Sequence, residues 1–175
     1  YDLVMDEEIT IIDSNTRNEK IKNFFINNKK KFTAGFCIIL VAIVSYLSMK
    51  EIENRNKIDL ANQFNITKMN FNKDNRETTI KQLINLVNKK DSTYSPLALY
   101  FIIDNKLIDN KDQINFLFDE LIKNTKLEKE IKNLIIYKKA LFNSDFVSEN
   151  DLLQTLSPII NSESIWKSHS LYLIA

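Results

Sequence analysis

Apolar residues are distributed along this chain in two ways, as one unbroken run near the N-terminus and as helical stripes beyond it. The run covers residues 32–49, eighteen residues without a charged side chain, between Lys31 and Lys50. As a helix this run would be about 27 Å long, close to the hydrocarbon thickness of a bilayer. The pattern therefore predicts a transmembrane helix over residues 32–49.

Two other interpretations of the run stay open. A cleaved signal peptide has a short positive region, an apolar core of about 7 to 15 residues and a small-x-small cleavage site. Here 31 residues precede the run, and the bulky Tyr46 and Leu47 stand where small side chains are required. A buried helix of a globular domain is the second alternative, but core helices of this length usually carry a polar face. The features of the run therefore favour an uncleaved membrane anchor over both a signal peptide and a buried core helix.

The flanks of the run predict its orientation. Six Lys or Arg residues lie within about fifteen residues before it and three lie after it, and the richer side is normally cytoplasmic. We therefore expect residues 1–31 to form a cytoplasmic N-terminal arm with a basic juxtamembrane segment, and residues 50–175 to lie outside. Within the arm, Ile21, Phe24 and Phe25 share one helical face, which favours a helix lying at the membrane surface. Alternatively, this segment simply extends the transmembrane helix.

Beyond residue 50 the apolar residues recur at i, i+3, i+4 and i+7, the spacing of one helix face. The stripe occurs three times, the second copy 34 residues after the first and the third 35 residues after the second: Ile80, Leu83, Ile84, Val87; Ile114, Leu117, Phe118, Leu121; and Leu152, Leu153, Leu156. The intervening helices keep the period, so that Leu97, Ile131 and Trp166 occupy equivalent positions. We expect Trp166 to be a core residue on this basis.

Capping signals mark the ends of these helices. Ser95 and Pro96 predict an N-cap followed by proline at the first helical position, and Ser148 with Asp151 resembles a capping box. The predicted helices cover residues 50–71, 75–90, 96–107, 111–124, 127–143, 149–160 and 163–175. The apolar end of the last helix also leads us to expect that the domain continues beyond Ala175.

A period near 34 in antiparallel helix pairs is typical of tetratricopeptide-type arrays. The expected fold is therefore all-α: a single N-terminal transmembrane helix followed by degenerate tetratricopeptide-like antiparallel helix hairpins that form a right-handed α-solenoid. A bundle of three or four helix pairs with accidental spacing is the alternative.

Composition removes several classes of function. A single glycine, Gly35, cannot supply a phosphate-binding loop, a dinucleotide fingerprint or a nucleophile elbow. One histidine and one cysteine cannot build a conventional four-ligand zinc site, and Asn-Gly or Asp-Gly hairpin turns do not occur. The net charge of +1 is evenly spread, so nucleic acid is not an expected partner. We expect no cofactor, and we expect that the protein is not an enzyme.

Helical arrays bind peptides on one face, through residues of the first helix of each pair that do not belong to the core stripe. The candidate peptide-groove residues are Tyr100, Asn105, Tyr137, Lys138 and Lys167. The alternative for each is an ordinary solvated or half-buried position. His169 is linked to no serine or cysteine nucleophile by any pattern, so a catalytic role is not expected for it.

Four stretches of the sequence resemble a known family. They are IKNFFINNKKKF before the run, KEIENRNKIDLANQFNI after it, STYSPLALYFIIDNKL, and SESIWKSHSLYLIA with its Trp at a helix entrance. Together with the order of arm, span and helical hairpins, they resemble the ancillary SecYEG translocon subunit family, membrane-anchored proteins with a tetratricopeptide-like domain. The resemblance extends over nearly the whole chain, although the glycines and alanines usual at the family's helix contacts are missing.

This resemblance implies a single-pass protein of the bacterial inner membrane with a cytoplasmic N-terminus and a periplasmic domain. The implied partners are the Sec translocon channel subunits and periplasmic chaperones, and the implied role is to assist, or chaperone, newly translocated proteins. Unfolded or nascent polypeptides and the lipid bilayer are the expected contacts. Two alternatives stay open, an anchored scaffold for envelope assembly or cell division and a tether for an unseen C-terminal enzyme domain.

Overall fold

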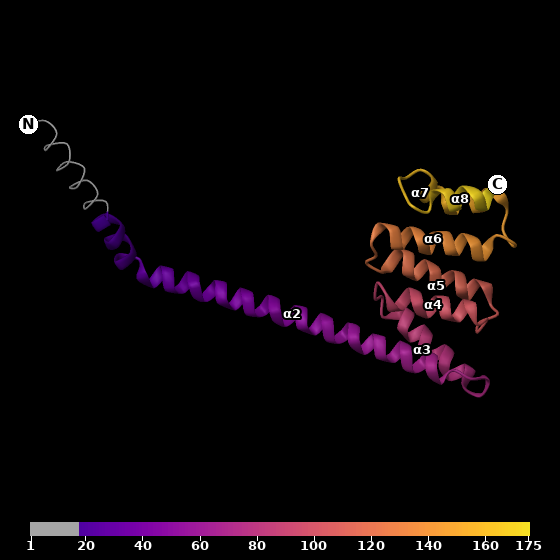
Figure 1. The fold of residues 1–175 in the computed structure, drawn as a ribbon, viewed down its shortest axis with the longest axis horizontal. Coiled ribbons are helices and arrows are strands. Elements are labelled where there is room, and N and C mark those ends of the chain that lie inside the picture. The colour runs from indigo at the N-terminus through magenta and orange to yellow at the C-terminus, as the bar shows by residue number, and fades with distance from the viewer. Residues whose placement is uncertain (1–17) are drawn as a thin grey trace, which may run out of the picture. The chain divides into compact units, whose positions relative to one another are not determined.

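The computed structural model describes residues 18–175, and all regular structure in that range is helical (Figure 1). Residues 18–27 are helical and Asn28 forms a turn before the next helix. The elements that follow are α2 (Lys29–Asn70), the 3₁₀ turn η1 (Lys73–Asn75), α3 (Arg76–Asn88), α4 (Tyr94–Asp104), α5 (Lys111–Asn124), α6 (Lys129–Asn143), α7 (Glu149–Ile160) and α8 (Lys167–Ile174). The predicted all-α class is confirmed for this part of the chain. The acidic beginning of the predicted arm, residues 1–16, lies outside it.

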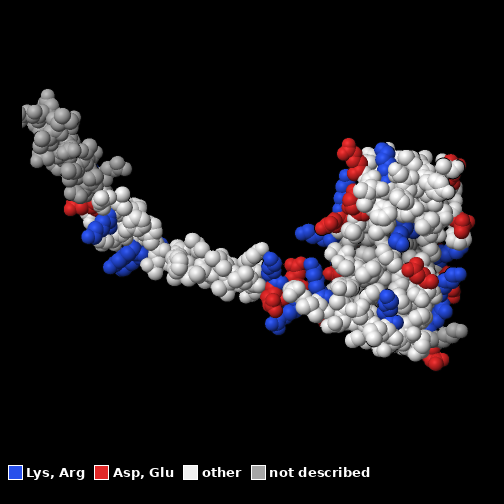
Figure 2. Space-filling view, viewed as in Figure 1, with Lys and Arg blue, Asp and Glu red and all other residues white. Residues whose placement is uncertain are grey.

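The chain divides into two compact units, Tyr1–Asn54 and Arg55–Ala175. The described part of the first unit contains the apolar run, which forms the N-terminal part of α2. By length and composition α2 is the candidate membrane span among the described residues, and none of its apolar window is buried. Figure 2 shows this window as a white stretch without charged side chains. The alternative of a buried core helix disagrees with the structure, because such a helix would be covered by its neighbours. A signal sequence near the N-terminus would have the same length and composition, so that alternative stays open.

The second unit is built from helices that each pack on the next along the chain, from α3 to α8 (Figure 1). The predicted stripes form much of its interior: Leu83 and Val87 of α3 and all four stripe residues of α5 are buried. Ala98 and Ala140 are also fully buried, where small side chains let neighbouring helices approach. Two hydrophobic clusters result: one extends from Phe64 near the end of α2 to Ile135 of α6, and the other joins Ile136 and Ala140 of α6 to α7 and α8.

Three positions that the period assigns to the core are not in it. Leu153 is 47% exposed, because α7 buries the face formed by Leu152, Leu156 and Ile159 and Leu153 lies beside that face. Leu97 and Ile131 are each 39% exposed. Their equivalent, Trp166, is half-buried against the second cluster rather than fully enclosed.

The start of α4 differs from its prediction. The helix begins at Tyr94, and the Asp91 carboxylate accepts the backbone N–H groups of Thr93 and Tyr94 at 2.9 and 2.7 Å. Ser95 is therefore not the N-cap. Its fully buried hydroxyl donates to the Leu86 carbonyl (2.7 Å) and accepts the Asp91 N–H (2.9 Å), which joins α4 to the end of α3. The prediction for α7 is confirmed, because the Ser148 side chain caps the helix by accepting the N–H of Asp151.

The C-terminal end of α4 is capped without a glycine. Lys106 takes the left-handed conformation (φ 50°) that glycine usually occupies, and the Leu107 N–H bonds to the Ile102 carbonyl at 2.9 Å. The buried Leu107 side chain then packs in the first cluster. The Arg76 guanidinium donates to the carbonyls of Lys106 and Leu107, which ties this turn to the start of α3.

Candidate functional site

A pocket of about 160 Å³ lies between α4 and α6, with α5 behind it. Its lining residues are Tyr100, Ile103 and Asp104 from α4, Phe118 from α5, and Lys138, Leu141 and Phe142 from α6. A cavity of about 150 Å³ lined by apolar side chains is large enough to hold benzene. The pocket therefore matches one aromatic ring or one branched aliphatic side chain.

Helical spacing explains why these residues meet. The α4 residues stand at i, i+3 and i+4, and so do the three from α6, so each helix presents one continuous face to the pocket. Phe118 is fully buried, and its ring centroid lies 6.1 Å from that of Phe142. The apolar base of the pocket is thus part of the hydrophobic core and is held in place by it.

Tyr100 and Lys138 bring polar chemistry to this apolar pocket. The Lys138 ammonium nitrogen lies 4.6 Å from the centroid of the Tyr100 ring, within the range of a cation–π interaction. The Tyr100 hydroxyl oxygen is buried and has no hydrogen-bond partner among the described residues. Burial raises the pKa of Tyr100 well above its usual value, because the phenolate would lose its hydration. Tyr100 is therefore a neutral donor at physiological pH.

The other three predicted groove residues lie elsewhere. Asn105 follows the last residue of α4, and its side-chain amide donates to the Phe101 carbonyl at 2.9 Å. Lys167 is the exposed first residue of α8. Tyr137 precedes Lys138 on α6, but its ring stacks on Trp166 with centroids 6.0 Å apart. The structure thus brings Tyr100 and Lys138 together and places Asn105, Tyr137 and Lys167 outside the pocket.

The aromatic contact of Tyr137 belongs to a joint between α6 and α8. His169 packs against the rings of Tyr137 and Trp166, with centroids 6.1 and 5.6 Å away. The Trp166 indole N–H donates to the Glu130 carbonyl (3.1 Å), and the Glu130 carboxylate accepts the Ser164 hydroxyl at 2.8 Å. Trp166 and His169 therefore have a structural role, because their contacts hold α8 against α6.

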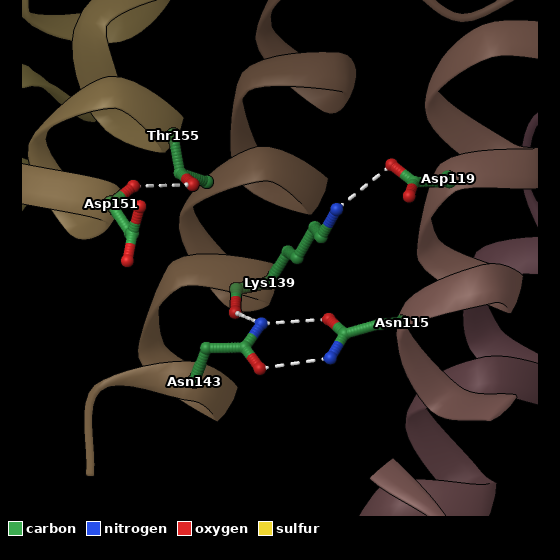
Figure 3. A network of polar contacts seen from close by, with 6 residues as sticks. All are labelled: Asn115, Asp119, Lys139, Asn143, Asp151 and Thr155. Atoms are coloured by element: carbon green, nitrogen blue, oxygen red, sulfur yellow. Dashed lines mark hydrogen bonds and ion pairs between the residues drawn. The ribbon is translucent and has the colours of Figure 1, made fainter. Parts of the chain in front are cut away.

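A polar network crosses the helices that flank the pocket (Figure 3). The side-chain amides of Asn115 on α5 and Asn143 on α6 exchange two hydrogen bonds of 2.9 and 2.7 Å. One turn away, the Lys139 ammonium contacts the Asp119 carboxylate at 2.8 Å. Because both pairs join α5 to α6, they fix the register of the helix that carries Lys138, Leu141 and Phe142.

Comparison with known proteins found no matching family model, curated protein or solved structure. Among residues 18–175, no group of three or more His, Cys, Asp or Glu side chains is arranged to hold a metal ion. What the pocket offers is an apolar base with an ammonium group, a carboxylate and a neutral phenol.

The sequence predicted Phe118 as a core residue, but it did not predict the other four residues that line the pocket: Ile103, Asp104, Leu141 and Phe142. Two of them carried a usable signal: Asp104 precedes the predicted groove residue Lys138 by 34 residues, one repeat period. Ile103 precedes Tyr137 by the same interval. Leu141 and Phe142 carry no such signal, since their part in the pocket depends on the packing of α6 against α4 and α5.

Proposed function

We propose that this chain is a membrane-anchored helical-repeat module that binds extended polypeptide segments and inserts one bulky apolar side chain of its ligand into the pocket. The pocket between α4 and α6 is the observation that carries this proposal. Its volume suits a single Phe or Leu side chain, and its lining holds both signs of charge, Asp104 and Lys138. Such a site recognises a side-chain size and the peptide groups next to it, without requiring one sequence.

The proposal takes the helices after η1 to be degenerate tetratricopeptide-like hairpins in a right-handed array, with α4, α6 and α8 as the peptide-facing helices. The stripe period of 34 to 35 residues supports this arrangement, as does the packing of each helix on the next. In such an array the space between two successive first helices faces the groove. In that arrangement the pocket between α4 and α6 would face the groove.

The energetics of one pocket predict weak and adaptable binding. Burying a Phe or Leu side chain contributes about 1.5–3 kcal/mol, which corresponds to a preference of about tenfold to 150-fold over alanine. A module that holds many different unfolded chains for a short time requires affinity of this kind. Anchoring to the membrane would raise the effective concentration of the module near emerging chains.

We further propose that the chain is an ancillary subunit of the Sec translocon, in the bacterial inner membrane, with a cytoplasmic N-terminus and a periplasmic helical domain. Its clients would be newly translocated proteins, and its partners the channel subunits and periplasmic chaperones. The apolar window of α2 and the excess of Lys and Arg before it support the membrane part of the proposal. The four sequence stretches that resemble the translocon family support the choice of partner.

Blocking the pocket tests the binding proposal. Leu141 lines the pocket and is 47% exposed, and Leu153 has the same exposure but lies outside it. A fluorescent Gly/Ser peptide with one central Phe should bind the full-length protein in nanodiscs about tenfold or more tightly than its Ala counterpart. Leu141→Trp should abolish that difference and Leu153→Trp should preserve it. Equal affinity for the two peptides would refute the pocket as a side-chain site.

The partner is tested in living cells. A photo-crosslinking amino acid at position 141 should capture Sec channel subunits, periplasmic chaperones or newly exported chains, and the same group at position 153 should capture markedly less. Recovery of envelope-assembly or division proteins from position 141 would make the translocon assignment wrong, although the binding module would stand.

A further inference from the structure

The helix over residues 18–27 and the first turn of α2 carry three phenylalanines whose rings contact one another. Phe25 and Phe32 stack with their centroids 4.9 Å apart, and Phe24 meets them edge-on at 6.0 and 5.9 Å. In one straight helix, Phe25 and Phe32 would be about 10 Å apart along the axis. The turn at Asn28, whose side-chain amide donates to the Phe24 carbonyl at 3.0 Å, brings Phe32 back to the other two rings.

This aromatic cluster is exposed to solvent. Phe24, Phe25 and Phe32 are 57%, 54% and 45% exposed, and Ile21 on the same face is 54% exposed. The three rings already hold each other in place, so little further side-chain entropy is lost when the cluster is covered. A contiguous exposed aromatic patch beside a candidate span has the chemistry of a membrane–water interface, where aromatic side chains concentrate.

The charges around the cluster indicate which surface would cover it. Residues 18–31 contain one acid, Glu19, and five lysines: Lys20, Lys22, Lys29, Lys30 and Lys31. Lys20 and Lys22 flank Ile21 at about 100° on either side of the helix. Their long stems can follow the apolar patch while the ammonium groups reach outward. Figure 2 shows basic groups beside white surface in this part of the chain, before the uncharged stretch.

We infer that residues 18–32 form a preformed binding surface for anionic phospholipid headgroups, with the phenylalanine cluster at the acyl boundary and the lysines on the phosphates. The inference rests on the membrane anchor of the proposed function, and it is independent of the pocket. Each lysine close to an anionic membrane surface contributes about 1 kcal/mol, or about fivefold in affinity. A short aromatic and basic segment would then hold the start of the span at a fixed depth in the membrane.

Trypsin cleavage of the full-length protein in nanodiscs tests the inference. One set of nanodiscs contains phosphatidylcholine alone and the other contains about 30 mol% phosphatidylglycerol. We expect cleavage after Lys20 and Lys22, relative to cleavage after Lys50, to be at least about fivefold slower in the anionic nanodiscs. Cleavage after Lys50 serves as an internal control for the effect of lipid charge on the protease. Raising the salt concentration to about 0.5 M should largely remove the protection.

Two variants of equal charge separate a local effect from net charge. Replacing Lys29, Lys30 and Lys31 with Gln should remove the lipid-dependent protection of Lys20 and Lys22. The control replaces Lys123, Lys126 and Lys129 with Gln, at exposed positions of the second unit, and should keep the protection. Equal cleavage ratios in the two lipids, or equal loss in both variants, would refute the inference and leave the anchor intact. If the chain enters neither kind of nanodisc, both the anchor and this inference are wrong.

Discussion

Replacing Ser95 with alanine is the sharpest test of how α3 and α4 are joined. The serine hydroxyl is fully buried and makes two hydrogen bonds, one to the Leu86 carbonyl and one from the Asp91 N–H. Alanine fits the same space but can neither donate nor accept. The substitution therefore removes polar contacts between helices while leaving the apolar packing unchanged.

The expected cost follows from the fate of each partner. The Leu86 carbonyl still accepts the Lys89 N–H at 3.2 Å, so losing the serine donor costs only about 0.5–1 kcal/mol. The Asp91 N–H loses its acceptor at a half-buried position, which costs about 1–2 kcal/mol more. The sum is about 2 kcal/mol. For a domain of this size, that corresponds to a decrease in Tm on the order of 8 °C.

Thermal unfolding of the full-length protein in mild detergent, followed by circular dichroism, measures the decrease. Ser92→Ala is the matched control, because Ser92 is exposed in the same loop and should change the unfolding free energy by less than about 0.5 kcal/mol. Hydrogen exchange at the Asp91 amide should become faster in Ser95→Ala alone. An unchanged Tm together with an unchanged Asp91 exchange rate would refute the role assigned to Ser95.

Three further predictions concern stability. Tyr100→Phe should stabilise the fold by about 1 kcal/mol at neutral pH, because it removes a buried hydroxyl without a partner. Burial raises the Tyr100 pKa, so above about pH 10 the unfolded chain loses the Tyr100 proton before the folded chain does. In urea titrations at increasing pH, the unfolding free energy of the wild type should therefore decline more steeply above this pH than that of Tyr100→Phe. A double-mutant cycle of Asn115→Ala and Asn143→Ala should give a coupling of about 1 kcal/mol, and additive losses would contradict the amide pair. Lys106→Gly should raise the unfolding free energy by about 0.5–1 kcal/mol by relieving its left-handed φ, whereas Lys81→Gly inside α3 should lower it by about 1 kcal/mol.

Much of the helical layout could be predicted from the sequence. The structure confirms the helix predicted over 111–124 as Lys111–Asn124 and the one over 149–160 as Glu149–Ile160. Both combine an apolar stripe with a side-chain cap at the first turn, Asn110 and Ser148 respectively. Such signals are local, because a cap and a stripe act within a few residues of the chain. The helix predicted over 163–175 instead begins at Lys167, because the preceding loop is held by contacts to Glu130 on another helix.

The candidate site was predicted only in part. Tyr100 and Lys138 do line the pocket, while Asn105, Tyr137 and Lys167 do not. The position of a residue relative to the core stripe shows whether its side chain avoids the core. It does not show which of these side chains contact one another across two helices. That depends on the crossing and register of α4, α5 and α6, which the Asn115–Asn143 pair and the Lys139–Asp119 pair help to set.

The sequence by itself determined that the domain after residue 50 is all-α, that an uncharged run long enough to span a membrane precedes it, and that the domain's stripes recur every 34 to 35 residues. These properties depend on hydrophobicity and helical period, which are read along the chain. Only the tertiary structure decided that Ser95 joins two helices, that Leu153 is exposed and that Tyr100 and Lys138 share one pocket. The physical reason is the same in each case. The burial and contacts of a side chain depend on residues that are distant in sequence, and a local sequence pattern does not show how close those residues lie in the fold.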